Sequence, residues 1–553
     1  MPTQVFEDAL DLRIGLIEAT LPNWRDRGAD SPSYPYPLLT PVATEETRRF
    51  RVFILENPYL RATVVPVLGG RLISLFDKRT GKEVLPRREA LRPLAGGRRG
   101  ASLHEGLQLR YDVRQDRLNA LGPVDVGDDD ETVWLAESAS PERIGFHLSI
   151  QLPADRAELI LEARMFNRSL RPRPYNGGFS VSMPESEVVP LENGVAAYDA
   201  KGDAGLAFLW DDPLTWSAGG GELRVSRFSG TGSLAPRQLD TLRVRLIPLS
   251  GLGGLTGASR EGGVFIGADA VRVQTTSNRT GHKLLLVTEE GQTMEAQTDL
   301  MPEHVVEIPL NGIKPRTLVV RDPAKVDVVR AERGVAHKAL ELPPVDSPEP
   351  WIGPDSPVWE LRRATADVSQ RALAHTLLGF RALAAREFAE AGEQFERTLL
   401  FNAEDHLAWW LKSLADHLRG VEGEQPELLN AHYLAPLEPA LRVQALLAQG
   451  ERQGNEPNPL LAPVAENPEN LVEVASLLLE AGLMAEASVW IDEALRHQDL
   501  PVLHLLQAYA FSHSKMDVES SRHAELADGL AAPPFPHREI EWKAVDRVIE
   551  RKP

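Results

Sequence analysis

Two polar stretches in the first fifth of the chain carry the residue types that acid–base chemistry needs. His104 and Glu105 are neighbours, directly after the basic, glycine-rich stretch 96–100. An imidazole beside a carboxylate can supply an acid and a base, although adjacent strand residues point to opposite faces. Arg71 follows two glycines, where a guanidinium can bind hydroxyls or a carboxylate. These residues are candidate site residues; exposed loop residues and a strand-end ion pair are the alternative interpretation.

Further polar residues lie at turns that could border a cleft. Tyr175 and Asn176 precede a Gly-Gly pair, and Glu192 and Asn193 precede another glycine. Trp210 stands just before an Asp-Asp-Pro turn, and a tryptophan face can stack on a sugar ring. Ordinary turn residues and a core tryptophan are the alternatives for this set.

Several established chemistries lack their motifs. The glycine-rich stretch 251–257 has no Gly-Lys-Ser/Thr, so it is not a phosphate-binding loop. The acidic run 128–131 is consecutive rather than alternating, which favours a solvated loop over a calcium site. There is no His-Glu-x-x-His pair and no Gly-x-Ser-x-Gly at a strand-to-helix turn. We therefore expect no metal and no cofactor.

The elements that must position these residues fall into two halves. Short alternating segments bounded by Gly, Pro, Asn or Asp predict an antiparallel β-sandwich over 48–335, including a strand over Leu107–Val113. Residues 1–47 are expected to pack on it. A proline-rich connector follows at 336–359, and a helical period then continues over 360–553.

The helical half contains two related segments. Gly379, Ala391 and Phe395 in one, and Ala487 and Trp490 in the other, match the spacing of tetratricopeptide repeats, in which small residues sit where paired helices come closest. We expect helical hairpins of this type, with a generic all-α domain as the alternative.

Composition excludes several partners. The chain has 553 residues, 42% hydrophobic, with 60 Lys+Arg against 80 Asp+Glu and a net charge of −20. A chain this acidic is poorly suited to nucleic acid or an anionic membrane surface. It has no cysteine, which excludes disulfides and thiolate metal sites. The start carries no secretory signal, and no segment is apolar enough to span a membrane, so we expect a cytoplasmic protein.

One stretch resembles a known fold family. Residues 56–81, ENPYLRATVVPVLGGRLISLFDKRTG, resemble the opening of galactose-mutarotase-like domains. They are similar in particular to an uncharacterised bacterial family that fuses such a domain to tetratricopeptide repeats. Phe166-Asn-Arg-Ser169, the stretch 248–255, the proline-rich connector and the helical tail fit the same family.

The resemblance implies a β-supersandwich whose concave face holds a carbohydrate. In mutarotases of this fold a glutamate acts as base and a histidine as acid, and other enzymes with the fold are glycoside hydrolases or lyases. Glu105 stands where the fused family places an acidic residue. The mutarotase histidine motifs and late glutamate motif are missing here, and the strand 175–183 has fewer aromatic residues than expected.

Three functional hypotheses follow. The first is a carbohydrate-active enzyme, a glycoside hydrolase or an aldose-1-epimerase-like protein, with Glu105 as base or nucleophile and His104 or Glu192 as acid. In this hypothesis Arg71 and Trp210 hold the substrate, and Tyr175, Asn176 and Asn193 line the cleft. The second is a non-catalytic sugar sensor whose repeats report to a partner. The third is a protein–protein scaffold that acts through the repeats.

Overall fold

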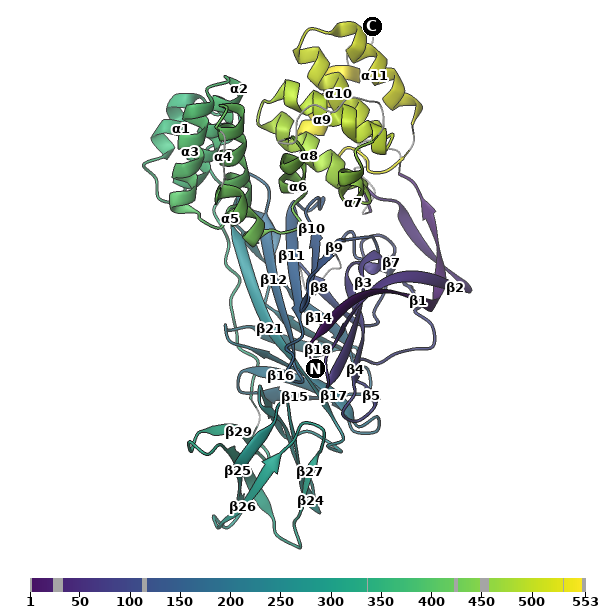
Figure 1. Cartoon of the computed structure of the whole chain (residues 1–553), viewed down its shortest axis with the longest axis vertical. Helices are drawn as coiled ribbons and strands as arrows, with labels where there is room; N and C mark the ends of the chain where they lie inside the picture. The colour runs from purple at the N-terminus through teal and green to yellow at the C-terminus, as the bar shows by residue number, and fades with distance from the viewer. Residues whose placement is uncertain are drawn as a thin grey trace.

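The N-terminal part of the chain is built from two large antiparallel sheets packed face to face (Figure 1). This computed structural model describes residues 2–22, 33–111, 117–335, 337–421, 426–447, 457–530 and 532–549. The nine-stranded sheet contains β1 (Gln4–Thr20), β2 (Leu38–Glu56), β3 (Leu60–Val65), β4 (Arg71–Asp77), β5 (Lys82–Glu83), β8 (Leu107–Arg110), β14 (Gly178–Ser182), β18 (Thr215–Gly219) and β19 (Glu222–Ser226). The eight-stranded sheet contains β9 (Asp125–Asp128), β10 (Thr132–Glu137), β11 (Ile144–Gln151), β12 (Leu159–Asn167), β15 (Glu187–Leu191), β16 (Gly194–Asp199), β17 (Ala204–Trp210) and β21 (Leu239–Ser250).

The main core lies between these sheets. Leu107 and Phe179 from the nine-stranded sheet meet Phe146 and Phe208 from the eight-stranded sheet. Period-two alternation explains this packing, since alternate residues of a strand reach the same face. The predicted strand Leu107–Val113 is observed as β8, Leu107–Arg110, and Val113 lies outside the described residues.

The outer face of the nine-stranded sheet has an apolar part and a polar part. Over β1 to β4 it forms a second core, where Leu91 and Leu103 pack with Leu12, Ile54 and Ile73. Two short pairs, β6 (Leu94–Ala95) with β7 (Ala101–Ser102) and β13 (Arg173–Tyr175) with β20 (Gly232–Leu234), complete this region of the chain. β2 continues through residue 47, and β1 and β2 pair along their length as two long antiparallel strands at the sheet edge.

A smaller β unit follows the sandwich and has its own core. Its two four-stranded sheets contain β22 (Gly257–Ser259), β23 (Gly262–Ile266), β24 (Ala270–Thr275) and β27 (Val306–Pro309), and β25 (Arg279–Thr288), β26 (Thr293–Leu300), β28 (Pro315–Arg321) and β29 (Asp327–Glu332). Val264, Leu284 and Leu318 lie in its core. In Figure 1 this unit lies at the end of the sandwich opposite the helices. The sequence pattern did not separate it from the main sandwich, because both use the same alternating strands.

Twelve α-helices are described in the C-terminal part. They are α1 (Val358–Ala364), α2 (Arg371–Ala384), α3 (Phe388–Phe401), α4 (His406–Leu418), α5 (Pro426–Leu434), α6 (Pro439–Leu447), α7 (Ala462–Ala465), α8 (Pro468–Glu480), α9 (Met484–His497), α10 (Pro501–His513), α11 (Asp517–Gly529) and α12 (Glu539–Ile549). A Cβ at Gly379 of α2 would lie 2.6 Å from the Phe395 ring of α3, so the small residue is needed for that helix contact. None of the described helices combines the length and apolar character needed to cross a membrane.

The predicted fold class is therefore confirmed: a large antiparallel β region precedes an all-α region. The two regions are joined by buried ion pairs. Arg237, beside β21, donates two hydrogen bonds to Asp405, at 2.9 and 2.6 Å. Asp405 also caps α4 by accepting a hydrogen bond from the Ala408 amide at 2.9 Å.

Candidate functional site

The polar part of the nine-stranded sheet's outer face lies over β4, β8, β14 and β19. In β8, Leu107 and Leu109 point into the core, so Gln108 and Arg110 point outward. The same alternation places Ser180 outward between Phe179 and Val181. In β19 it places Glu222 and Arg224 on the outer face. The cross-strand pairs Gln108–Ser180 and Ser180–Arg224 align three of these side chains, and Arg110 and Glu222 flank them; we call these five side chains the row.

A chain of hydrogen bonds connects the first half of this row. Arg71 Nη2 donates to Gln108 Oε1 at 2.6 Å, and Gln108 Nε2 lies 3.2 Å from Ser180 Oγ. Arg71 Nη1 donates to the backbone carbonyl of Glu105 at 3.0 Å. Arg71 is only 1% exposed, so its charge is held beneath the loop that carries Glu105.

The second half of the row is an arginine–carboxylate cluster. Glu222 accepts hydrogen bonds from Arg110 Nη1 at 3.0 Å and from Arg224 Nη2 at 2.6 Å. Burial by itself raises the pKa of Glu222, but the hydrogen bond from Arg224 and the charge of Arg110 outweigh it and lower that pKa. Glu222 is therefore held as a carboxylate, which suits it to accepting hydrogen bonds rather than to donating a proton.

Glu105 is the one carboxylate of this region with an unused buried oxygen. Glu105 is only 8% exposed, and its Oε2 has no hydrogen-bond partner among the described residues. Its Oε1 lies 3.7 Å from Arg88 Nε. A buried acceptor without a donor costs about 1–3 kcal/mol, so a hydrogen-bond donor brought to this oxygen would stabilise the protein.

The backbone beside Glu105 depends on glycine. Gly106 has φ +77°, and a Cβ there would lie 2.5 Å from the Leu72 carbonyl oxygen and 3.2 Å from Arg71 Cγ. Only a residue without a side chain allows the loop to close this tightly over Arg71. The close approach fixes Glu105 against the sheet.

His104 points away from its neighbour. Its side chain is exposed and lies 3.2 Å from Ser102 Oγ through Nε2. No hydrogen bond joins His104 to Glu105 within the described part of the chain. The imidazole therefore stands at the rim, while the carboxylate is buried; both residues lie in the loop between β7 and β8.

A cavity of about 200 Å³ opens beside this region. It is lined by β1, by Thr47 of β2, by Ile73 of β4, and by residues 87–89 and 91. Arg88 belongs both to this cavity wall and to the surroundings of Glu105. The cavity is smaller than the roughly 300–1,000 Å³ typical of drug-sized ligand pockets, so it suits one small polar unit.

The remaining predicted residues are not brought to this row. Glu192 and Asn193 are exposed in the β15–β16 turn of the other sheet. Tyr175 is 1% exposed and donates a hydrogen bond through its hydroxyl to Asp240 at 2.6 Å. Asn176 is buried and donates to the carbonyls of residues 228 and 230. Trp210 packs in the main core. The contacts of the last three stabilise the sandwich itself.

The sequence analysis missed most of the row. Gln108, Arg110, Ser180, Glu222 and Arg224 were not singled out, although each alternates with core residues. The segments LQLR, GFSVS and ELRVS carry that signal. It identifies the outward face of each strand, but it does not show that the three strands are neighbours.

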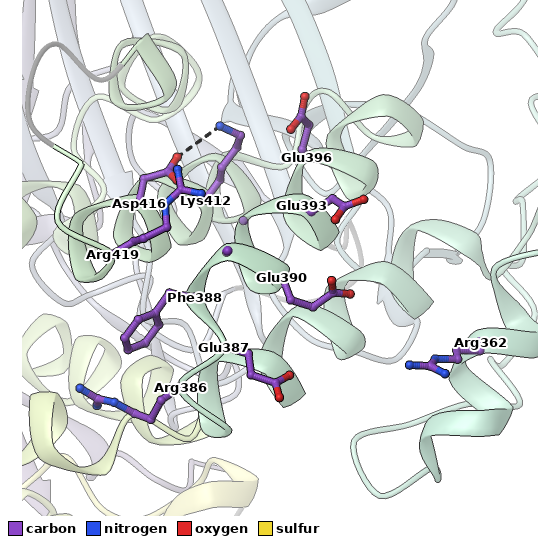
Figure 2. Close-up of a pocket in the computed structure, with 12 residues that line it drawn as sticks. Arg362, Arg386, Glu387, Phe388, Glu390, Glu393, Glu396, Lys412, Asp416 and Arg419 are labelled. Carbon is purple, nitrogen blue, oxygen red and sulfur yellow. Dashed lines mark hydrogen bonds and ion pairs between the residues drawn. The ribbon is translucent and has the colours of Figure 1, made fainter.

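A second, wider hollow lies on the helical region. It has a volume of about 1110 Å³ and is lined by α1, α3 and α4 and the residues around them (Figure 2). Glu387, Glu390, Glu393 and Glu396 follow one another along this side of α3. The cations of the wall are largely paired: Lys412 with Asp416 and Glu427, Arg419 with Asp416, and Arg386 with Glu486.

One segment of the chain matches a known domain family. Residues 29–186 match DUF5107, a domain of unknown function. As the predicted resemblance expects, the chain is also similar to solved structures of a tetratricopeptide-repeat protein and of galactose mutarotase-like proteins.

Solved structures with a similar arrangement cover different shares of the chain. A tetratricopeptide-repeat protein from Parabacteroides distasonis is 13% identical, covers 100% of this chain and 96% of its own, and has a TM-score of 0.39. A galactose mutarotase-like protein from Lactobacillus casei is 11% identical, and the match covers 36% of this chain and 99% of that protein, with a TM-score of 0.27. The 4-alpha-glucanotransferase of Thermococcus litoralis is 18% identical, and the match covers 36% of this chain and 37% of that protein, with a TM-score of 0.25.

Proposed function

We propose that the outer face of the nine-stranded sheet binds a sugar or oligosaccharide and that Glu105 acts on it as a carboxylate base. The observation that carries the proposal is the unpartnered, buried Oε2 of Glu105 beside the hydrogen-bonded chain from Arg71 to Ser180. A sugar hydroxyl both donates and accepts, so it can donate to Glu105 while accepting from a neighbouring guanidinium or amide.

The arrangement favours proton transfer over glycoside hydrolysis. Glycosidases use two carboxyl groups, one of which must donate a proton. Glu222 is held ionised by Arg110 and Arg224, and Glu192 lies on the other sheet. His104 at the rim is the available acid, so an aldose-epimerase-like reaction, with Glu105 as base and His104 as acid, fits these residues best.

The test is a ligand screen followed by an anomer-exchange measurement. Neutral monosaccharides, uronates and short oligosaccharides are titrated into the full chain by NMR, and exchange between anomers is then followed for any sugar that binds. We expect Glu105→Gln to remove exchange while the protein stays folded, because the amide matches the carboxylate in size. Glu192→Gln, exposed on the other sheet, is the matched control and should leave exchange unchanged. Exchange that survives in Glu105→Gln contradicts the proposal.

A non-catalytic sugar sensor is distinguished by the same experiment. Saturable binding without exchange in the unmodified protein, together with weaker binding in Glu105→Gln, would assign the row to recognition alone. Failure of every sugar to bind would remove the carbohydrate proposal in both forms.

A docking role of the helical region is the second candidate. Its specific support is the hollow of Figure 2, in which the exposed carboxylates of Glu387 and Glu396 have no ion-pair partner in the described part of the chain. Such a wall suits a basic protein segment. Binding of a lysine- and arginine-rich peptide should weaken as salt rises and in the double variant Glu387→Gln/Glu396→Gln. Unchanged binding in that variant would exclude this surface.

A further inference from the structure

The contact between the sandwich and the helices buries an unusual number of ionisable groups. Arg143 and Arg168 of the sandwich side both donate to Glu473 of α8, at 2.7 and 2.9 Å. Arg168 also donates two hydrogen bonds to Glu438, at 2.7 and 3.1 Å. Arg538 completes the cluster on the helical side by binding Glu473 at 2.7 Å.

At one end of this cluster stand two histidines and a glutamate from three different elements. His147 projects from the outer face of β11, His406 is the first residue of α4, and Glu438 precedes α6. One nitrogen of each imidazole and one carboxylate oxygen of Glu438 all lie within 4.8 Å of one another. All three side chains are buried. The rings of His147 and His406 are 6.0 Å apart and meet edge to face.

His147 has an unmet hydrogen-bonding requirement. It is 8% exposed, and its Nδ1 is buried without a hydrogen-bond partner among the described residues. His406 Nε2 contacts Glu438 Oε2 at 3.2 Å. A buried imidazole nitrogen without a partner carries a free-energy cost that a metal–ligand bond would remove.

The arginine and glutamate charges of the cluster do not cancel. Seven of its members are joined by hydrogen bonds: Arg143, Arg168, Arg538, Glu438, Glu469, Glu473 and Glu541. These three arginines and four glutamates carry a formal excess of one negative charge. A divalent cation held by Glu438 would offset that excess.

We propose that His147, His406 and Glu438 bind a divalent transition-metal ion that ties the sandwich to the helical region. Two imidazoles and one carboxylate form a ligand set typical of Zn²⁺, with water as the fourth ligand. Arg168 donates to both oxygens of Glu438, including the Oε2 that His406 contacts, and these paired hydrogen bonds orient the carboxylate. Because one ligand comes from the sandwich and two from the helices, the ion would stabilise their contact.

The test uses the full chain after removal of metal with a chelator. Co²⁺ is titrated as a spectroscopic probe and Zn²⁺ by calorimetry. We expect one high-affinity ion per chain, a Co²⁺ absorption band typical of nitrogen and oxygen ligands, and a rise in the unfolding temperature on loading. His147→Gln should weaken binding at least tenfold. The double variant His504→Gln/His523→Gln removes a partly exposed histidine pair elsewhere and should leave binding unchanged.

Two results would overturn the proposal. One is the absence of stoichiometric binding, and the other is binding that survives in His147→Gln but is lost in the His504/His523 double variant. If His147→Gln does not fold, X-ray absorption of the Zn²⁺-loaded unmodified protein decides the question, because it must show two imidazole ligands. Fewer than two would refute the site.

Discussion

Replacing the buried Asp125 by asparagine should stabilise the protein, and more so as the pH rises. Asp125 begins β9, and both of its oxygens accept hydrogen bonds from Asn470 Nδ2 of α8, at 2.8 Å each. Burial raises the pKa of Asp125 to about 7 from 3.8, although the hydrogen bond from Asn470 and the charge of Arg442 act in the opposite direction. The site therefore favours a neutral side chain.

The direction and size of the stability change follow from the pKa of Asp125 in the folded protein and in the unfolded chain. Between pH 3.8 and about 7 the folded protein keeps a proton on Asp125 that the unfolded chain releases, so folding stability falls as pH rises through this window. A gap of about 3 pKa units corresponds to about 4 kcal/mol as an upper limit above pH 7. Asparagine carries no such penalty, although it keeps only one of the two oxygens that accept from Asn470 Nδ2. We expect Asp125→Asn to gain about 1–3 kcal/mol at pH 8 and under about 1 kcal/mol at pH 4.

Urea unfolding at pH 4, 6 and 8, followed by tryptophan fluorescence, measures this difference. Asp130→Asn is the matched control, because Asp130 is exposed in the turn after the same strand. A stability difference that does not change with pH, or a variant that is less stable at pH 8, would refute the assignment of Asp125 as a destabilising buried carboxylate.

Three further substitutions test the structural roles of single residues. Trp210→Ala should cost about 3–5 kcal/mol of folding stability because it empties a core position; a loss below about 1 kcal/mol in urea unfolding would contradict that placement. Arg168→Met should cost about 3–5 kcal/mol by leaving Glu438 and a share of Glu473 without their partner, measured as a lower urea midpoint. Gly106→Ala should cost at least about 1–3 kcal/mol and weaken any ligand binding, since the backbone there is left-handed and crowded. Wild-type stability of that variant would show that the loop over Arg71 can relax.

The order of elements was predictable because each region has a strong local period. Alternating strands, a proline-rich connector and helical repeats can be recognised in the sequence without tertiary information. The small residue at Gly379 was predicted to mark a close helix contact, and it lies against Phe395. Glu105 and Arg71 were singled out because a carboxylate and a guanidinium beside glycines stand out within a segment, and their role in a site stays a prediction.

Other assignments depended on which face of a strand is covered. β17 reads AGLAFLW, with every residue buried, so its sequence has no alternation to show that Trp210 points into the core. Tyr175 and Asn176 resemble turn residues in sequence, yet their polar atoms are used by Asp240 and by backbone carbonyls. Hydrogen bonds made by distant segments decide these cases.

The proposed metal ligands show the same limit more strongly. His147 lies more than 250 residues before His406 and Glu438, so no spacing motif joins the three residues. The expectation of no metal rested on the absence of such motifs. They come together only where His406, at the start of α4, and Glu438, just before α6, meet the sandwich beside His147 of β11.

The buried contact between the two regions also bears on how a ligand signal would travel. Arg237 with Asp405, and Arg168 with Glu438 and Glu473, cross from sandwich to helices with almost no exposed atoms. Rotation of one region against the other would separate buried charges, and breaking one such pair costs about 3–5 kcal/mol. A sugar bound at Glu105 would have to supply that free energy several times over to move the helices. The structure therefore favours a rigid platform, with the proposed sheet site and the helical hollow at a fixed separation, over a sensor that works by domain rotation.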